Sequence, residues 1–150
     1  MVNLKELRIG NIILHNGQLA EVLGVGPKGL LINGHKDGDS LEPLPLSNYL
    51  LEQLLGKYPV NGKRVFCYYK STYFLDYEEQ KDWTGNIYQE YSGYYVGMYD
   101  KSQLIHVTPH HFHFYHELQN VHFAQFGTEI GVSFDKITRV WINAINIGRI

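Results

Sequence analysis

Histidines gather in one stretch of the chain. Five of the eight histidines fall between His106 and His116, and a carboxylate follows them at Glu117. Neutral imidazoles and carboxylates that converge on one point are common ligands of a divalent metal. In a helix, residues three and four apart share a face, so His110, His113 and Glu117 would point the same way. We therefore predict these three residues as a candidate metal site.

Two known motifs fit this stretch in part. His111, His113 and Glu117 match the H-x-H-x-x-x-E core of the cupins, but the glycines that flank this core are missing. His106 and Thr108 match the H-x-T of two-histidine phosphoesterases, which need a second such motif, and the sequence has none. The alternative to metal chemistry is a polar helix start, with histidines that are solvated or hydrogen-bonded to tyrosines.

Tyrosine is the other abundant residue type with useful chemistry. The chain has 12 Tyr, 7 Phe and 2 Trp, and many of them fall in its middle. Their rings can stack on flat ligands such as nucleobases, and neighbouring amides and imidazoles can add hydrogen bonds. We predict Tyr94, Tyr95, Tyr99, His116 and Asn120 as ligand-binding residues. A tyrosine-rich sheet with a purely structural role is the alternative, and no residue is assigned a catalytic role.

Composition excludes several classes of protein. The apolar fraction of 44% is typical of a folded globular chain. A net charge of −2 provides no basic field, so we do not expect nucleic acid as a partner. We see no signal segment and no apolar run of about 18 residues, so we predict a cytoplasmic protein with no membrane partner. The single cysteine, Cys67, cannot form an intrachain disulfide, and we interpret it as a small buried side chain.

The N-terminal part is predicted to be β structure. Apolar runs at residues 12–15 and 19–23 flank Asn16 and Gly17. Asn-Gly is a strong signal for a two-residue hairpin turn, because both turn residues need positive φ. With a further strand at residues 30–32, these segments suggest a small SH3-like β unit.

Two helices are predicted. Ser47 is a suitable N-cap for a helix over residues 48–55, which carries leucines at helical spacing. Thr108 with the proline after it would start a second helix over about residues 110–126, and Gly127 would end it.

The remaining segments are predicted to be strands. The apolar C-terminal stretch 138–147 would be an aggregation-prone edge strand unless it were paired or covered. Pairing with a second copy is one solution, so we expect a homo-oligomer. A shorter strand is expected at residues 130–134. The antiparallel meander is expected at residues 64–70, 72–78, 86–91, 93–99 and 102–107. The sequence thus predicts an α+β fold in a single domain, 1–150, with a soft boundary near residues 57–63.

Three stretches resemble a group of uncharacterised proteins from bacteriophages, prophages and mobile elements. Leu7-Arg8-Ile9-Gly10-Asn11 matches their L-x-I-G-N opening, and Glu42-Pro43-Leu44-Pro45-Leu46 is similar to their E-P-I-P-L stretch. The segment from His116 to Ala124 resembles their H-x-L-Q-N-L-Y-F-A helix, and the likeness continues through Glu129. The resemblance implies a mobile-element origin and no particular activity. The tyrosine-rich middle and the tail beyond the helix depart from the group's pattern.

Three functions follow as hypotheses. The first is a non-enzymatic binding protein of phage type, which antagonises host defence by sequestering a small nucleotide-like signalling molecule or by occupying a host protein. The second is a metal-dependent hydrolase that uses the cluster from His106 to Glu117. The third is a nucleic-acid-binding module, which the overall charge argues against. We expect the first, with no cofactor.

Overall fold

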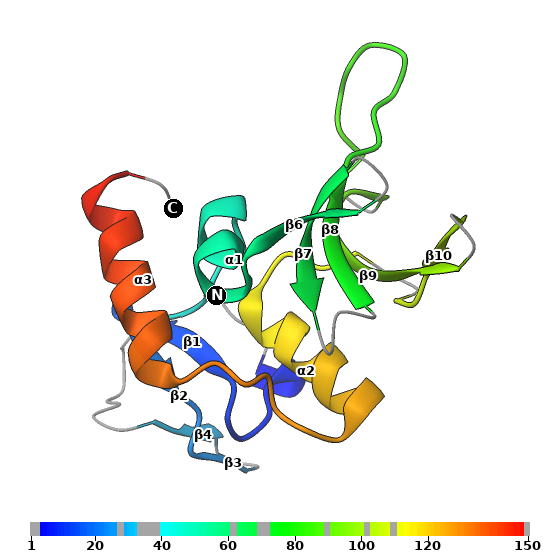
Figure 1. Ribbon diagram of the computed structural model, residues 1–150. Helices are drawn as coiled ribbons and strands as arrows, with labels where there is room; N and C mark the ends of the chain where they lie inside the picture. The colour runs from blue at the N-terminus through cyan, green and yellow to red at the C-terminus, as the bar shows by residue number, and fades with distance from the viewer. Residues whose placement is uncertain are drawn as a thin grey trace. The chain divides into compact units, whose positions relative to one another are not determined.

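The chain forms two compact units, Met1–Ser47 with Phe114–Ile150 and Asn48–His113. We call the first the discontinuous unit and the second the central unit. The computed structural model describes residues 4–26, 29–32, 40–60, 63–68, 73–88, 91–100, 103–108 and 111–148, without the side chains of 58–60, 63–65, 67–68, 99–100 and 104. Helices and antiparallel sheets are both present, which confirms the α+β prediction (Figure 1).

The discontinuous unit begins with a short 3-10 turn, η1 (Leu4–Glu6), and a three-stranded sheet in the order β2-β1-β5. These strands are β1 (Ile12–His15), β2 (Gln18–Glu21) and β5 (Leu41–Pro43). The predicted hairpin between β1 and β2 is confirmed, since Asn16 and Gly17 have φ of 52° and 80°. The SH3-like detail is not confirmed.

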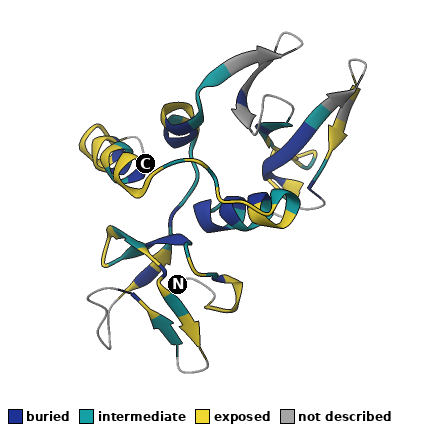
Figure 2. Ribbon diagram, turned by 60° about the horizontal axis from the view of Figure 1, so that its bottom comes forward, coloured by how far each residue is buried: buried dark blue, intermediate teal, exposed yellow. Residues whose placement is uncertain are grey.

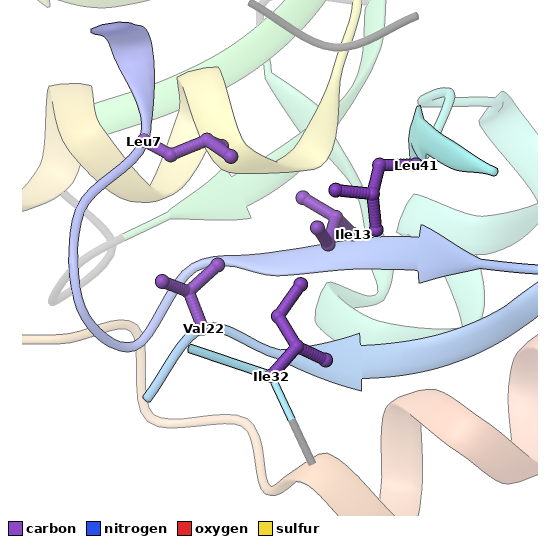
Figure 3. Close-up of a cluster of buried hydrophobic side chains, with 5 residues drawn as sticks. All are labelled: Leu7, Ile13, Val22, Ile32 and Leu41. Atoms are coloured by element: carbon purple, nitrogen blue, oxygen red, sulfur yellow. The ribbon is translucent and has the colours of Figure 1, made fainter. Parts of the chain in front are cut away.

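A separate two-stranded hairpin joins β3 (Gly24–Gly26) to β4 (Gly29–Leu31). Its glycines have the G-x-G-x-x-G spacing of a dinucleotide-binding loop, but a second strand follows them where such a loop needs a helix. Five apolar side chains from the N-terminal part of the unit pack together as its core (Figure 3): Leu7, Ile13, Val22, Ile32 and Leu41.

Two helices complete the discontinuous unit, α2 (Tyr115–Phe126) and α3 (Phe134–Asn146). The predicted C-terminal strand, 138–147, and the strand at 130–134 are therefore wrong. Ser133 caps α3 by accepting a hydrogen bond from the backbone N–H of Lys136 at 3.2 Å. Ile137, Trp141 and Ala144 lie at helical spacing and are buried, while other positions along α3 are exposed (Figure 2).

The central unit starts with α1 (Asn48–Leu55), at the predicted residues. A five-stranded antiparallel sheet follows in the order β10-β9-β8-β7-β6. Its strands are β6 (Lys57–Val60), β7 (Lys63–Tyr68), β8 (Tyr73–Glu78), β9 (Gly93–Asp100) and β10 (Gln103–His106). The meander is confirmed, except that residues 86–88 lie in the loop that projects between β8 and β9 (Figure 1).

The second predicted helix starts later than expected. Phe112 pairs with Tyr94 of β9 through two backbone hydrogen bonds, so the chain is extended where a helix from 110 was predicted. Thr108 does not cap the helix, because its hydroxyl accepts a hydrogen bond from the backbone N–H of Val96 at 3.1 Å. Gly127 ends α2 at φ 69°, as predicted.

Register determines which side chains share a face of the central sheet. Gly93 pairs with Glu78, Tyr95 with Asp76 and Gly97 with His106. Successive side chains alternate between faces, so Glu78, Tyr95 and His106 lie on one face. The other face is apolar and buried: Leu75, Tyr94, Val96 and Phe112.

The division between the two units falls at Ser47 and His113, and the single-domain prediction stays a prediction. Among the described residues, no helix has the length and apolar character to cross a membrane.

Candidate functional site

The polar face of the central sheet carries a hollow of about 440 Å³. One carboxylate, two imidazoles, one amide and two phenol rings line it. We call it the histidine–tyrosine hollow, and its lining residues are Glu78, Gln80, Tyr88, Tyr91, His106 and His111. Small-molecule sites commonly enclose about 300–1,000 Å³ and combine apolar walls with a few polar groups.

Glu78 lies at the centre of the polar groups. Nε2 of His111 is 3.1 Å from Oε2 of Glu78, and Nε2 of His106 is 3.7 Å from the same oxygen. Because a carboxylate only accepts hydrogen bonds, Nε2 of His111 must be the protonated nitrogen. The bond from His111 lowers the pKa of Glu78 below its ordinary value of 4.5, with smaller contributions from Gln80 and His106. Glu78 is therefore an anion at neutral pH.

Aromatic rings hold the two histidines in place. The ring of Tyr95 stacks on His106 with centroids 4.3 Å apart and an angle of 19° between the planes. It meets His111 edge to face at 5.9 Å. The two imidazoles are themselves nearly perpendicular, with centroids 6.4 Å apart. Tyr95 is 3% exposed, so it supports the histidines from behind.

The loop after β8 contributes Gln80 and Tyr88 to the lining of the hollow. Its tip is an Asx turn, in which Oδ1 of Asp82 accepts hydrogen bonds from the backbone N–H groups of Thr84 and Asn86 at 2.8 and 2.9 Å. The backbone N–H of Tyr88 donates to the carbonyl of Gln80 at 2.8 Å. These bonds close the loop on itself and bring its second half back beside Gln80.

The second half of this loop brings two tyrosines to the hollow. Tyr88 and Tyr91 are 50% and 58% exposed, and their rings meet edge to face with centroids 6.2 Å apart. Exposed aromatic rings beside a fixed carboxylate can stack on a flat molecule while the carboxylate accepts its N–H groups. The hollow is thus suited to a planar ligand with hydrogen-bond donors.

The tyrosines predicted from the sequence have different places. Tyr94 faces the buried side of the sheet, where its hydroxyl donates to Oδ1 of Asn48 at 2.8 Å and its ring meets Tyr77 edge to face. Burial raises the pKa of Tyr94 to about 12. Tyr95 supports His106 in the hollow. The side chain of Tyr99 lies outside the described residues.

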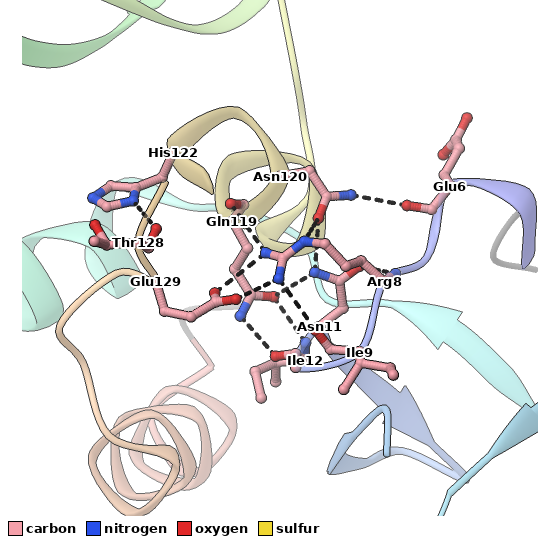
Figure 4. A network of polar contacts seen from close by, with 11 residues as sticks. Glu6, Arg8, Ile9, Asn11, Ile12, Gln119, Asn120, His122, Thr128 and Glu129 are labelled. Atoms are coloured by element: carbon pink, nitrogen blue, oxygen red, sulfur yellow. Dashed lines mark hydrogen bonds and ion pairs between the residues drawn. The ribbon is translucent and has the colours of Figure 1, made fainter. Parts of the chain in front are cut away.

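Asn120 and His116 belong to α2 in the discontinuous unit. The amide of Asn120 is used within the unit: its Oδ1 accepts from Asn11 and from Arg8, at 2.9 and 3.2 Å, and its Nδ2 donates to the backbone carbonyl of Glu6 at 2.8 Å (Figure 4). His116 is 1% exposed and stacks on Phe114. Its ring nitrogens have no hydrogen-bond partner in the described structure, although Nε2 lies 3.6 Å from a carboxylate oxygen of Glu6.

The same network joins the segment at residues 7–11 to the segment at residues 116–129. The side-chain amide of Gln119 donates to the carbonyl of Gly10 and accepts from the N–H of Ile12, at 3.0 and 2.8 Å. Arg8 forms an ion pair with Glu129 (Figure 4). The L-x-I-G-N segment and the helix motif are therefore hydrogen-bonded to each other, which is a structural role for both.

Two of the three residues predicted as metal ligands are described, and they lie in different units. Glu117 accepts a hydrogen bond from the backbone N–H of Phe114 at 3.2 Å and so caps α2. His113 packs against Gly93 in the central unit. His110 lies outside the described residues. Among the residues that are described, no three His, Cys, Asp or Glu side chains are grouped so that they could hold a metal ion.

The discontinuous unit carries other hollows, and one of about 370 Å³ has His15, Glu21 and Phe134 in its lining. Another in the discontinuous unit encloses about 330 Å³ between β2 and α3 and is mainly apolar, with Phe134, Trp141, Ile142 and Ile145 in its lining. None of the described residues that line it is titratable. In the histidine–tyrosine hollow, one oxygen of Glu78 lies 3.1 and 3.7 Å from two imidazole nitrogens, and two exposed tyrosine rings line the same hollow.

His106 and His111, from the histidine-rich stretch that the sequence singled out, line this hollow, whereas sequence reasoning did not single out Glu78, Gln80, Tyr88 or Tyr91. Strand register would have found Glu78, because it pairs with the first residue of β9, near Tyr95. The two tyrosines depend on the loop closure, which sequence spacing does not show. Comparison of the chain with known protein families, curated proteins and solved structures finds no match.

Proposed function

We propose that this chain is a small-molecule-binding protein, and that its histidine–tyrosine hollow takes a flat, polar ring of the nucleobase type. The observation that carries the proposal is the arrangement around Glu78. Its carboxylate lies within 3.1 and 3.7 Å of two imidazole nitrogens, in a hollow that two exposed tyrosines also line. A ring that stacks on tyrosine and donates to Glu78 would use both features.

The aromatic walls supply most of the expected affinity. Tyr88 and Tyr91 leave about half of their surface exposed, and a bound ring would remove part of that surface from water. Stacking of one base on an aromatic side chain contributes about 1–3 kcal/mol. Such stacking tolerates many rings, so the polar groups of the hollow must provide the selectivity.

Sequestration is the biological role that fits a binding site without an assigned reaction. The resemblance of three segments to proteins of phages, prophages and mobile elements favours a host signalling molecule as the ligand. Such a protein acts by lowering the free concentration of its ligand, so it needs affinity and abundance but no turnover.

A panel of mononucleotides tests the proposal. Native mass spectrometry of the freshly purified chain is followed by isothermal titration with AMP, GMP, CMP and UMP. We expect at least one nucleotide to bind with one-to-one stoichiometry and to be recovered unchanged. Absence of binding by all four, with no retained small molecule, would contradict the proposal, and a converted nucleotide would favour an enzyme.

The chain offers matched variants for this experiment. Replacing Tyr88 and Tyr91 together by leucine removes two stacking faces and should abolish binding. Trp83→Leu is the control, because Trp83 is 96% exposed on the same loop and does not line the hollow. Equal loss in both variants would show that the loop, and not the two tyrosine faces, determines binding.

A host protein is the second candidate partner, and Trp83 is the observation that favours it. A tryptophan that is 96% exposed at the tip of a hydrogen-bonded turn resembles the aromatic anchors of protein interfaces. If this candidate holds, Trp83→Ala should lose a host protein that the wild-type chain retains on an affinity column. Nucleotide binding should be unchanged in that variant.

A further inference from the structure

The free acceptor sites of Glu78 point to a specific ring. We propose that the histidine–tyrosine hollow selects a guanine base, held by its adjacent N1–H and N2–H donors on the two oxygens of Glu78. This inference rests on the proposed binding function, and it adds the identity of the base.

The first step is a count of the acceptor sites of Glu78. A carboxylate has about four lone-pair sites, two on each oxygen. Nε2 of Gln80 donates to Oε1 at 2.9 Å, and Nε2 of His111 donates to Oε2 at 3.1 Å. His106, at 3.7 Å from Oε2, is beyond hydrogen-bonding distance. In the described structure one site on each oxygen is left, so each oxygen of Glu78 can accept one more hydrogen bond.

The second step is a comparison of the common bases. Guanine carries two adjacent donors on its pairing edge, which match the two oxygens of one carboxylate. Adenine and cytosine each place a ring-nitrogen acceptor beside their amino group, and that lone pair would face a carboxylate oxygen. Uracil has one N–H between two carbonyls. A site that accepts two hydrogen bonds rejects ligands that leave one acceptor unpaired or opposed.

The third step separates guanine from a guanidinium group, which has the same pair of donors. Arginine would bring a positive charge next to His106 and His111. A guanidinium has donors only, whereas guanine also carries a carbonyl acceptor beside N1–H, to which an imidazole N–H can donate. The two histidines thus favour a guanine nucleotide over an arginine side chain.

The experiment compares GMP, IMP and AMP by isothermal titration on the full chain. IMP has the guanine N1–H but lacks the 2-amino group, so it removes one donor without changing the ring. We expect GMP to bind about tenfold or more tightly than IMP, and AMP to be weaker still, since a two-bond contact commonly discriminates by this amount or more. N-acetyl-arginine amide should not compete with GMP.

Two matched carboxylate variants follow. Glu78→Gln replaces one acceptor by a donor and should lower the affinity for GMP by about tenfold or more, so that the preference over IMP is lost. Glu79→Gln is the control, because it removes the same charge one residue away, from a side chain that pairs with Lys81 at 3.1 Å. Circular dichroism verifies that both variants are folded.

The outcomes separate the two proposals. Equal affinity for GMP, IMP and AMP, or an unchanged preference in Glu78→Gln, overturns the assignment to guanine but leaves a binding protein. Tighter binding of the arginine derivative than of GMP also overturns it. No binding of any nucleotide overturns the proposed function, and the assignment to guanine with it. The comparison of GMP with IMP uses the wild-type chain and does not depend on the folding of a variant.

Discussion

At the scale of single residues, Glu78 and its partner His111 determine the electrostatics of the site. The hydrogen bond from His111 is the main cause that lowers the pKa of Glu78 below 4.5. A lowered pKa in the folded state means that this carboxylate stabilises the fold above its ordinary pKa, and that the contribution is lost as the pH falls through the lowered value.

We therefore expect a graded response to substitution. His111→Phe should raise the pKa of Glu78, and His106→Phe should raise it less, because His106 is farther away and contributes only through its charge. Carbon-13 NMR titration of the Glu78 carboxyl group between pH 2 and 6 measures this directly. A larger rise in His106→Phe than in His111→Phe would contradict the assigned hydrogen bond.

The residues of the site could be predicted only in part. The sequence drew attention to His106 and His111 because histidines cluster there, and to Tyr95 because tyrosines do. Residue type alone could not separate Tyr94, which is buried and bonded to Asn48, from Tyr95, which supports His106. That difference depends on which face of β9 is covered, and this is a tertiary property.

At the scale of elements, the amide of Gln119 joins α2 to the start of β1. It pairs with a carbonyl and an N–H of the main chain, at Gly10 and Ile12, as a neighbouring strand would. Replacing it by leucine leaves both backbone groups unpaired next to an apolar side chain. Each unsatisfied buried group costs about 1–3 kcal/mol.

We expect Gln119→Leu to lower the free energy of unfolding by about 2 kcal/mol or more, because two backbone groups lose their partner and each costs at least about 1 kcal/mol. The matched control is Gln125→Leu on the same helix, because the buried Oε1 of Gln125 has no hydrogen-bond partner in the described structure. Urea denaturation of the two variants provides the comparison. Equal loss of stability would indicate that the helix, and not the amide clamp, is sensitive to leucine.

Gly93 shows why one element boundary tolerates no side chain. Its φ is +135°, and a Cβ built on it would lie 2.7 Å from Cε1 of His113 and 3.0 Å from the carbonyl oxygen of Phe112. Gly93→Ala should therefore lose about 1–3 kcal/mol of stability, the usual cost of such backbone strain. Thermal unfolding measures this loss. Gly131→Ala is the control and should leave the stability almost unchanged, because a Cβ at this position meets no atom within 4 Å and the φ of Gly131 is not positive.

Most elements could be predicted from the sequence, and the failures share a cause. The hairpin at Asn16 and the helix over 48–55 depend on local signals, and both were right. The start of α2 was wrong because Phe112 finds a strand partner in β9, which is a long-range contact. The strand at 138–147 was wrong because isoleucine and valine favour strands, whereas the Ser133 cap and the spacing of Ile137, Trp141 and Ala144 favour a helix.

At the scale of the whole molecule, the two units divide the chain unequally. The discontinuous unit needs both ends of the chain, and the network of Arg8, Gln119 and Glu129 joins them. The predicted homo-oligomer was based on an exposed C-terminal strand, and that strand is the helix α3. Oligomerisation stays a prediction, with the exposed side chains of Ile142 and Ile145 as its remaining support.

The central unit is one continuous segment, Asn48–His113, and it contains every residue that lines the histidine–tyrosine hollow. The hydrogen bonds that position Glu78, Gln80 and Tyr88 also begin and end within it. Chains of about 55–65 residues often fold alone, although their stability is marginal. A fragment of residues 48–113 should therefore fold and retain the ligand preference of the full chain.

Two-dimensional NMR of this fragment tests the prediction, because dispersed amide signals report a folded sheet. Titration with GMP should move the signals of the loop after β8 and of His106 and His111 more than those of α1. A folded fragment that binds no nucleotide, although the full chain does, would mean that the discontinuous unit contributes to the site. An unfolded fragment would mean that the sheet depends on that unit for its stability, since the local hydrogen bonds alone would then be insufficient.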